Sequence, residues 1–524
     1  MINLLEIAAP TLEWFQLAPL LIVFIGAAVG IVAEAVVPRA LRYVIQCFVA
    51  VLTVIVALGF TVLAGIEFEA GRVIAMGIIA HDGPTLLFWG LLLLVGLGGI
   101  AVFAERGVGD GSSAFAASAA TVPGSPLERE AVALKREHTE VFPLLLFSLF
   151  GMMVFASSND LITMFVSLEV FSLPLYLLSA MGRRRRLLSQ EAALKYFLLG
   201  SLASAFFVYG VALLYGFSGG FRFVQIAETI DAGTGSNVLL LTGLVMLAVG
   251  LLFKIGAVPF HTWVPDVYTG APTPVTGYMA VATKTAAIAA LLRVFFIGLG
   301  GARWDWQPLI AVVALLTMLV GATIGLLQTD VKRLLAYSSV VHAGFLLVAV
   351  TGAVAGADLG VTSVSAIVFY LITYGLATLG AFGIVTMVRR AGGEANNLDA
   401  WRGLGKSDPL VATLMTLFFL SLAGIPPTAG FIGKLTVFQA AAAGGYGWLV
   451  FAAVVCSVVA AFFYLKVVVT MWFRDPVPET AATVVAPSLW TWTLIIVSAA
   501  ATLVLGLLPG GLLDLLAGLS PFVR

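Results

Sequence analysis

The stretch Leu251-Leu-Phe-Lys-Ile-Gly-Ala-Val-Pro-Phe-His261 decides how this chain folds. It continues an apolar segment long enough to cross a membrane, yet Lys254 lies within it and the helix breakers Gly256 and Pro259 follow at once. A charged amine at the bilayer centre costs at least about 2.5–3.5 kcal/mol, so such residues usually face protein or water and serve a function. The stretch therefore predicts a broken membrane helix whose lysine belongs to a proton or ion pathway.

The composition of the whole chain is that of a membrane protein. Of its 524 residues, 61% are hydrophobic and 10% are charged, which is not the composition of a soluble domain. Apolar runs of roughly 20 residues, the length that crosses about 30 Å of hydrocarbon, recur along the chain. They predict an all-α polytopic membrane protein with about fourteen transmembrane helices, at residues 14–37, 41–64, 84–104, 141–156, 161–181, 191–217, 238–268, 274–298, 308–327, 334–354, 364–388, 409–442, 447–473 and 489–508.

Several other classes of protein are disfavoured. Cys47 and Cys456 both fall in apolar spans, and two separate thiols cannot supply the roughly four ligands of an iron–sulfur cluster. The formal net charge is zero, which gives no indication of nucleic-acid binding. No Gly-rich phosphate loop follows a strand and opens a helix. Glu6 and Glu13 stand where a signal peptide would be basic, so a cleaved leader is not expected.

The basic residues predict which ends of the spans face the cytoplasm. The odd-numbered loops carry 17 Lys and Arg, including the run Arg183–Arg186, whereas the termini and even-numbered loops carry 4. Because basic loops remain cytoplasmic, this split predicts that both termini lie on the outer side and that Arg183–Arg186 lies in the cytoplasm. The remaining six lie within spans: Lys195, Lys254, Lys284, Arg293, Lys434 and Lys466.

Five regions follow one another along the chain. Residues 1–104 hold three leading spans, and residues 105–140 form a polar cytoplasmic loop with a short helix near Leu127–His138. Residues 141–298 and 308–473 hold five predicted spans each, and residues 474–524 hold the last span.

The two five-span regions are predicted to be inverted repeats. The seventh and twelfth spans are too long, and each is interrupted, by Gly256 and Pro259 in one and by Gly424-Ile-Pro-Pro427 in the other. They are five spans apart in the chain order, and an odd offset reverses their direction across the membrane. Paired interrupted helices in two halves indicate inverted repeats (spans 4–8 and 9–13) with an ion site at the breaks.

Glu169 is the candidate partner of Lys254. It lies about ten residues into the fifth span, in Val166-Ser-Leu-Glu-Val-Phe-Ser-Leu-Pro174, and hence near the middle of the membrane. At about 6 Å and an effective dielectric constant of about 20, the pair would attract by about 2.8 kcal/mol. Changing their separation would therefore switch the lysine between holding and releasing a proton. The alternative is a carboxyl group kept protonated in the core.

Two further lysines are candidates for the same pathway. Lys284 lies about ten residues into the eighth span, too deep to reach an interface easily. We interpret it as a central proton relay, and the alternative is a structural lysine bonded to backbone carbonyls. Lys434 lies in the outer part of the twelfth span as a candidate exit-side carrier, and the alternative is that it extends to the outer interface.

Secondary candidates are Lys195, His261 and His342. Lys195 is near the cytoplasmic end of its span, where extending to the interface is as plausible as a relay role. His261 follows Pro259 and either connects the cytoplasm to Lys254 or caps the broken helix, and His342 faces the same choice.

Three other side chains are of interest. Glu34, near the inner end of the first span, is a candidate for pairing with a neighbouring subunit, with packing as the alternative. Tyr370 and Tyr374 share one helix face and either line a hydrated path or pack as aromatics.

The longer segment Phe253-Lys-Ile-Gly-Ala-Val-Pro-Phe-His-Thr-Trp-Val-Pro-Asp-Val-Tyr-Thr-Gly-Ala-Pro-Thr-Pro-Val275 resembles the antiporter-like membrane subunits of respiratory complex I, the proton-pumping NADH:quinone oxidoreductase. These subunits are related to Mrp-type sodium/proton antiporters. Asp266-Val-Tyr-Thr-Gly-Ala-Pro272, Ala282-Thr-Lys284 and Glu191-Ala-Ala-Leu-Lys-Tyr-Phe-Leu-Leu-Gly200 resemble the subunit-N branch. The similarity covers roughly residues 141–473.

The resemblance implies roles for four residues. Glu169 and Lys254 match the family's glutamate–lysine pair, Lys284 its central lysine and Lys434 its twelfth-helix lysine. It also implies fourteen helices with inverted five-helix repeats, and partners among the antiporter-like M subunit and the small K-, J- and A-type subunits. FMN, iron–sulfur clusters and quinone would belong to other subunits, and this chain would hold no cofactor.

Three functions remain open at this point. The first is proton translocation driven by quinone reduction elsewhere in the complex, and the second is a sodium/proton antiporter subunit without a redox partner. The third is a structural membrane subunit whose lysines pair only locally. The subunit-N motifs favour the first.

Overall fold

The computed structural model describes residues 12–109, 113–118, 121–134, 136–352, 362–390, 393–477, 479, 481–519 and 521–523. Long helices form a single bundle, in which twelve helices of the described part are long and apolar enough to cross a membrane. They are α1 (Trp14–Val36), α2 (Arg39–Ile66), α3 (Gly83–Phe103), α6 (Leu161–Ala180), α7 (Arg186–Ser218), α9 (Asn237–Ile255), α11 (Thr273–Arg293, continued to Gly298), α12 (Arg303–Leu326), α13 (Val331–Thr351), α14 (Ser363–Met387), α18 (Gly447–Phe473) and α19 (Leu489–Leu507). Shorter apolar helices are α5 (Val141–Ser157), α16 (Pro409–Ala423) and α17 (Ala429–Ala443).

The predicted all-α polytopic fold is confirmed. Each of the fourteen predicted spans coincides with a helix, and the seventh and twelfth are each a pair of helices. The sixth begins at Arg186, five residues earlier than predicted. The inverted relation between the two five-span regions stays a prediction.

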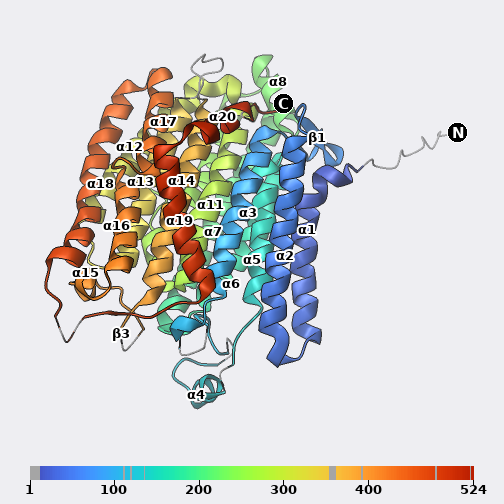
Figure 1. Ribbon diagram of the computed structural model, residues 1–524. Coiled ribbons are helices and arrows are strands. Elements are labelled where there is room, and N and C mark those ends of the chain that lie inside the picture. Colours follow the sequence, from blue (N-terminus) through green and yellow to red (C-terminus); the bar gives the residue numbers. More distant parts are fainter. Residues whose placement is uncertain are drawn as a thin grey trace.

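The bundle has two distinguishable ends (Figure 1). One, called here the terminal end, carries the C-terminus, β1 and α8. The other, called the basic end, carries α4, α15 and β3. The Arg183–Arg186 run also lies at the basic end, because it connects α6 to α7 on that side.

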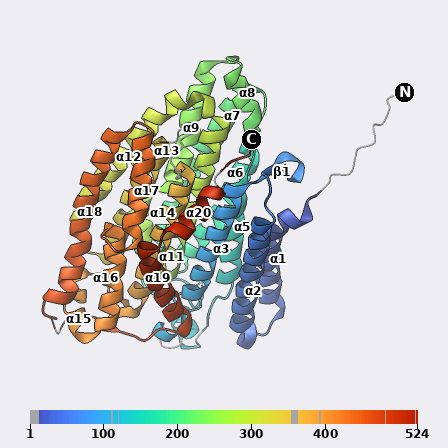
Figure 2. The same ribbon diagram turned by 45° about the horizontal axis from the view of Figure 1, so that its top comes forward.

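The centre of the bundle is formed by α11, α13 and α14. In the most apolar 18-residue segment of α13, every residue is buried inside the protein. In the corresponding segments of α2 and α18, only about a third of the residues are buried. Figure 2 places α1 and α2 along one edge and α18 along the opposite edge. Apolar side chains outside and polar ones inside suit a bundle in lipid, because only the interior can satisfy polar groups.

Both predicted helix breaks are present, and they have the same local geometry. Helix α9 ends at Ile255, and Gly256 follows in the left-handed conformation with φ +81°. Helix α16 ends at Ala423, and Gly424 adopts φ +81°. Glycine accepts this conformation without a steric penalty and terminates the helix by bonding back to its last turn. Each break is followed by a second helix, α10 (Trp263–Gly270) or α17.

Short elements at both ends were not predicted. They are the hairpin β1 (Arg72–Ile74) and β2 (Ile79–His81), helix α8 (Phe223–Asp231), helix α15 (Leu404–Ser407), helix α20 (Gly510–Gly518), and a sheet of order β4 (Gly393–Glu394), β3 (Val388–Arg390), β5 (Thr483–Val484). The predicted loop helix is α4 (Pro126–Ala133), which ends earlier than expected. Ser125 caps α4 by accepting a hydrogen bond from the Glu128 amide.

Candidate functional site

The structure brings five of the predicted residues into one series of neighbouring helices. Glu169 lies on α6, Lys254 on α9, Lys284 on α11, His342 on α13 and Lys434 on α17. We call these five the buried row. The last four are at most 5% exposed, although each is polar or charged. Such burial requires bonded partners, and these partners define the site.

Lys254 is held by hydroxyl groups and aromatic rings. Its Nζ donates to the hydroxyl of Ser172 at 2.8 Å and to that of Tyr176 at 3.5 Å. It also lies 5.4 Å from the ring centres of Phe171 and Tyr196. Rings at this distance stabilise a cation through their negative faces. The site can therefore hold a charged amine without a direct carboxylate.

Glu169 is near Lys254 but makes no direct ion pair with it. The carboxylate accepts a hydrogen bond of 2.5 Å from Ser204, and no bridge of 4.0 Å or less joins it to the lysine. It still lies within electrostatic reach of Lys254. Ser172, one turn after Glu169 on α6, occupies the contact position. The structure thus shows the predicted pair as separated.

Lys284 is linked to the next helices through Ser339. Its Nζ donates both to the carbonyl and to the hydroxyl of Ser339, the latter at 2.8 Å. The Tyr374 hydroxyl also bonds to the Ser339 hydroxyl, at 3.0 Å. The carbonyl bond is of the kind that a structural lysine makes, and the hydroxyl bonds connect Lys284 through Ser339 to Tyr374.

His342 forms a second hydrogen-bonded group next to this one on α13, with its ring centre 5.0 Å from that of Tyr374. Its Nδ1 lies 2.5 Å from the hydroxyl of Tyr370, and its Nε2 lies 3.1 Å from that of Tyr464. Tyr464 bonds in turn to Ser338. The ring is within electrostatic reach of both Lys284 and Lys434. His342 therefore occupies the position between the two lysines.

Lys434 points back toward its helix break. Its Nζ donates to the carbonyl of Ala423 at 2.7 Å and to the hydroxyl of Ser457 at 2.8 Å. The side chain is 5% exposed, so it does not extend to the outer interface, which was the alternative expectation.

Lys195 and His261 lie outside the buried row. Lys195 is 43% exposed and pairs with Glu191 at 2.8 Å and Asp266 at 2.9 Å. His261 lies in the segment between α9 and α10, and its Nδ1 is buried without a hydrogen-bond partner. No direct bond joins either side chain to Lys254 among the described contacts.

The hydroxyl partners are what the sequence analysis missed. They are Ser172, Tyr176, Ser204, Ser339, Ser457 and Tyr464. Ser172 and Ser339 could have been recognised from the sequence. Ser172 lies three residues after Glu169 and Ser339 three residues before His342, so each shares a helix face with a candidate residue. Tyr464 had no such signal. Within the described ranges, no three His, Cys, Asp or Glu side chains are grouped as metal ligands would be.

Comparison with known proteins identifies the family. The model of a family described as NADH:quinone oxidoreductase/Mrp antiporter, transmembrane, matches residues 158–460, which contain the entire buried row. The chain belongs to this family. Its relatives in this family include NADH-quinone oxidoreductase subunit N of Nocardioides sp. (strain ATCC BAA-499 / JS614), 53% identical over 99% of this chain and 100% of the relative. The subunit N of Cutibacterium acnes is also 53% identical, over 99% and 97%.

Solved structures share the fold of this chain. A chain of respiratory complex I from Thermus thermophilus is 34% identical, with a TM-score of 0.75 over 95% of this chain and 99% of that one. A chain of the Mrp complex from Dietzia sp. has the same TM-score at 22% identity, which shows a shared fold alone.

Proposed function

We propose that this chain translocates protons as the N-type membrane subunit of a NADH-quinone oxidoreductase, and that the buried row carries the protons. The relatives that are 53% identical over nearly the full chain bear the subunit-N name. One observation supports the route above all. Buried lysines on α9, α11 and α17 alternate with hydroxyls and His342 from Ser172 to Ser457. Proton transfer needs such groups within hydrogen-bond reach, directly or through one water.

The separated Glu169–Lys254 pair provides the switch. With the carboxylate bonded to Ser204 and the amine to Ser172, the lysine is free to pass its proton toward Lys284. Bringing the two together would hold the proton on Lys254 by about 2–3 kcal/mol at a separation of about 6 Å. Moving one charge against 100 mV requires about 2.3 kcal/mol, so a change in this one distance has the right magnitude.

A sodium/proton antiporter without a redox partner is the alternative. The Mrp complex from Dietzia sp. shares the fold, but at 22% identity against 53% for the subunit-N relatives. The greater identity therefore favours the subunit of the oxidoreductase.

The chain is a multi-pass protein of a bacterial membrane, and its finer placement is part of the proposal. We place the basic end in the cytoplasm because Arg183–Arg186 lies there, which leaves both termini on the outer side. We expect contacts with the M subunit and the small K-, J- and A-type subunits of the membrane arm. FMN, iron–sulfur clusters and quinone are expected in other subunits.

Reconstitution tests the proposal. Complexes containing Lys254→Ala or the unaltered chain are placed in vesicles, and protons translocated per NADH oxidised are measured. With the electron-transfer arm removed, proton and sodium transport are measured directly. We expect Lys254→Ala to lower the ratio in an assembled complex, and the unaltered chain to transport only with the arm present. If the Lys254→Ala complex translocates as many protons per NADH as the unaltered complex, Lys254 has only a structural role. Sodium-dependent transport without the arm would establish the antiporter.

A further inference from the structure

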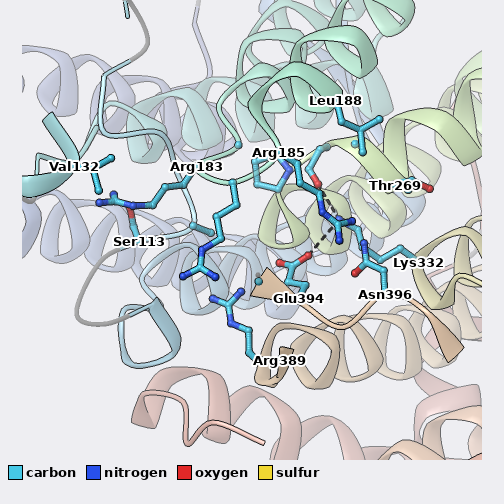
Figure 3. A pocket seen from close by; sticks show the side chains of 17 residues that line it. Ser113, Val132, Arg183, Arg185, Leu188, Thr269, Lys332, Arg389, Glu394 and Asn396 are labelled. Carbon is cyan, nitrogen blue, oxygen red and sulfur yellow. Dashed lines mark hydrogen bonds and ion pairs between the residues drawn. The ribbon is translucent and has the colours of Figure 1, made fainter. Parts of the chain in front are cut away.

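A cavity of about 310 Å³ opens among loops at the basic end of the bundle. Its wall combines Arg183, Arg184 and Arg185 with Lys332 and Arg389, against one carboxylate among the described lining residues, Glu394. Figure 3 shows the labelled members of this set around one space. The wall therefore has a formal excess of four positive charges. The buried row does not include any of these residues, so the cavity has no part in the proposed relay.

One of the cations is built into the protein rather than lying on its surface. Lys332 is 2% exposed, and its Nζ donates to the carbonyl of Ala271 at 2.9 Å and lies 3.7 Å from Glu394. The single carboxylate is thus already matched to Lys332, as the dashed lines in Figure 3 mark. Among the described residues, Arg183 donates only long bonds of 3.4 Å, to the Phe115 and Arg136 carbonyls, so its guanidinium can still bind an external anion.

Two neutral polar groups of the wall also point to a ligand. The hydroxyl of Ser113 and the side-chain oxygen of Asn396 are buried and have no hydrogen-bond partner. Both residues are more than nine-tenths buried. Buried polar atoms in proteins almost always have a hydrogen-bond partner. Two unpartnered polar atoms in the wall of one cationic cavity therefore indicate a polar ligand. The Ser113 hydroxyl can donate to an anionic oxygen, whereas the Asn396 oxygen only accepts and would need a donor on the ligand, such as a hydroxyl group.

The cavity borders an apolar surface. A more open hollow beside it shares Arg183, Arg185, Val132 and Leu188 with the cavity wall. Leu187, which lines that hollow, is 71% exposed. At the end of a membrane bundle, the cations can bind the anionic headgroup of a phospholipid, and the exposed apolar side chains beside them can contact its acyl chains.

We propose that this cavity binds a phosphate group, carried by an anionic phospholipid headgroup or by soluble phosphate. Guanidinium groups match phosphate oxygens in charge and in paired geometry. The bound group would join the turn between α10 and α11 to the start of α13, since Lys332 on α13 already bonds the Ala271 carbonyl of that turn. The proposal concerns binding alone and does not depend on the proton route.

The test uses the whole purified complex, with Arg184→Gln combined with Arg389→Gln in the chain. Arg474→Gln is the matched control, because Arg474 is exposed and does not line the cavity. One arm measures binding of inorganic phosphate to lipid-depleted complex by equilibrium dialysis. The other measures retention of phosphatidylglycerol from mixed phosphatidylcholine nanodiscs by native mass spectrometry. Whichever of the two assays shows saturable binding identifies the source of the phosphate group, soluble phosphate or the phospholipid.

We expect the double variant to weaken the saturable binding by about tenfold or more, since each charge-assisted bond contributes substantially. The control should bind as the unaltered chain does. Asn396→Asp is a second variant that keeps the side-chain shape while adding a negative charge to the wall, and it should weaken binding as well. Normal NADH oxidation confirms that each variant complex is assembled. Absence of saturable binding in both arms, or equal binding by all variants, overturns the proposal.

Discussion

The ammonium group of Lys434 closes the end of the helix that precedes it, because its Nζ donates a 2.7 Å hydrogen bond to the carbonyl of Ala423, the last residue of α16. At the other break the carbonyl of Phe253 accepts from the Gly256 amide at 3.0 Å and from the indole of Trp263 at 2.9 Å. Broken backbone at membrane depth needs such partners. The two breaks are satisfied differently, so Lys254 is left to hydroxyl groups while Lys434 is tied to backbone.

Lys434→Met is expected to stop proton delivery and also to weaken the fold. The Ala423 carbonyl would lose its donor inside the bundle, which costs about 1–3 kcal/mol. Lys466→Met is the matched control, because Lys466 also bonds backbone carbonyls, those of Leu326 and Gln328, away from the buried row. Protons per NADH in vesicles and thermal unfolding are measured for both. A control that loses translocation equally would mean that stability alone explains the effect.

The Lys284–Ser339–Tyr374 contact predicts a coupled pair of variants. Ser339→Ala and Tyr374→Phe each remove the bond between the two hydroxyls, and the loss of about 0.5–1.5 kcal/mol should slow translocation about two- to tenfold. The double variant should be little slower than the worse single one, because both act on the same linkage. Turnover-linked proton release measures this. Tyr278→Phe is the control, since its hydroxyl bonds Ser148 away from the row at 3.0 Å. Strictly multiplicative effects would contradict a shared route.

The charged members of the buried row could be predicted from the sequence because each is a charged residue within an otherwise apolar segment. A lysine in an apolar span is visible against its neighbours, and Gly256 or Gly424 marks the break beside it. The hydroxyl partners were not predictable in this way. Serine and tyrosine are tolerated throughout membrane helices, and only packing decides that Tyr464 of α18 reaches His342.

Other differences between expectation and structure have similar causes. Glu34, a candidate for pairing with a neighbouring subunit, pairs within the chain with Arg42 at 2.9 Å and accepts from Thr139 at 2.5 Å, and its contact with another subunit stays a prediction. Residue 139 is over a hundred positions away in the chain, so no local pattern indicates this contact. The strands of two or three residues are too short to show an alternating pattern, which is why β1–β5 were missed.

Arg293 and Asp82 form a buried ion pair whose separation should be costly. Their side chains are 1% and 0% exposed and lie 2.6 Å apart, joining α11 to the start of α3. Arg293→Met would leave the carboxylate buried and unpaired, and we expect a loss of about 3–5 kcal/mol. Adding Asp82→Asn should restore part of it, since the buried charge is then absent. Yield of assembled complex and thermal unfolding report the result. A double variant no more stable than Arg293→Met would show that charge burial is not the cause.

His81 should make the β1–β2 hairpin sensitive to acid. The residue is 4% exposed, and neither ring nitrogen has a hydrogen-bond partner. Burial lowers its pKa below the ordinary 6.5, Arg72 lowers it further, and Asp82 opposes the shift. The unfolded hairpin therefore binds the proton more readily than the folded one. Stability is complete above the ordinary pKa and falls as the pH drops below it, by at most about 1.4 kcal/mol per pH unit.

His81→Phe removes this titration and keeps a ring against Trp89, whose ring centre lies 6.3 Å away. Hydrogen exchange of the Arg72–His81 amides measures opening of the hairpin in the assembled complex at about pH 8 and about pH 5.5, on either side of an ordinary histidine pKa. We expect the variant and the unaltered chain to differ more at the lower pH, with the variant better protected. His138→Phe, a partly exposed site at the basic end, controls for general acid effects. The same loss of protection in the His81 variant would mean that another group titrates.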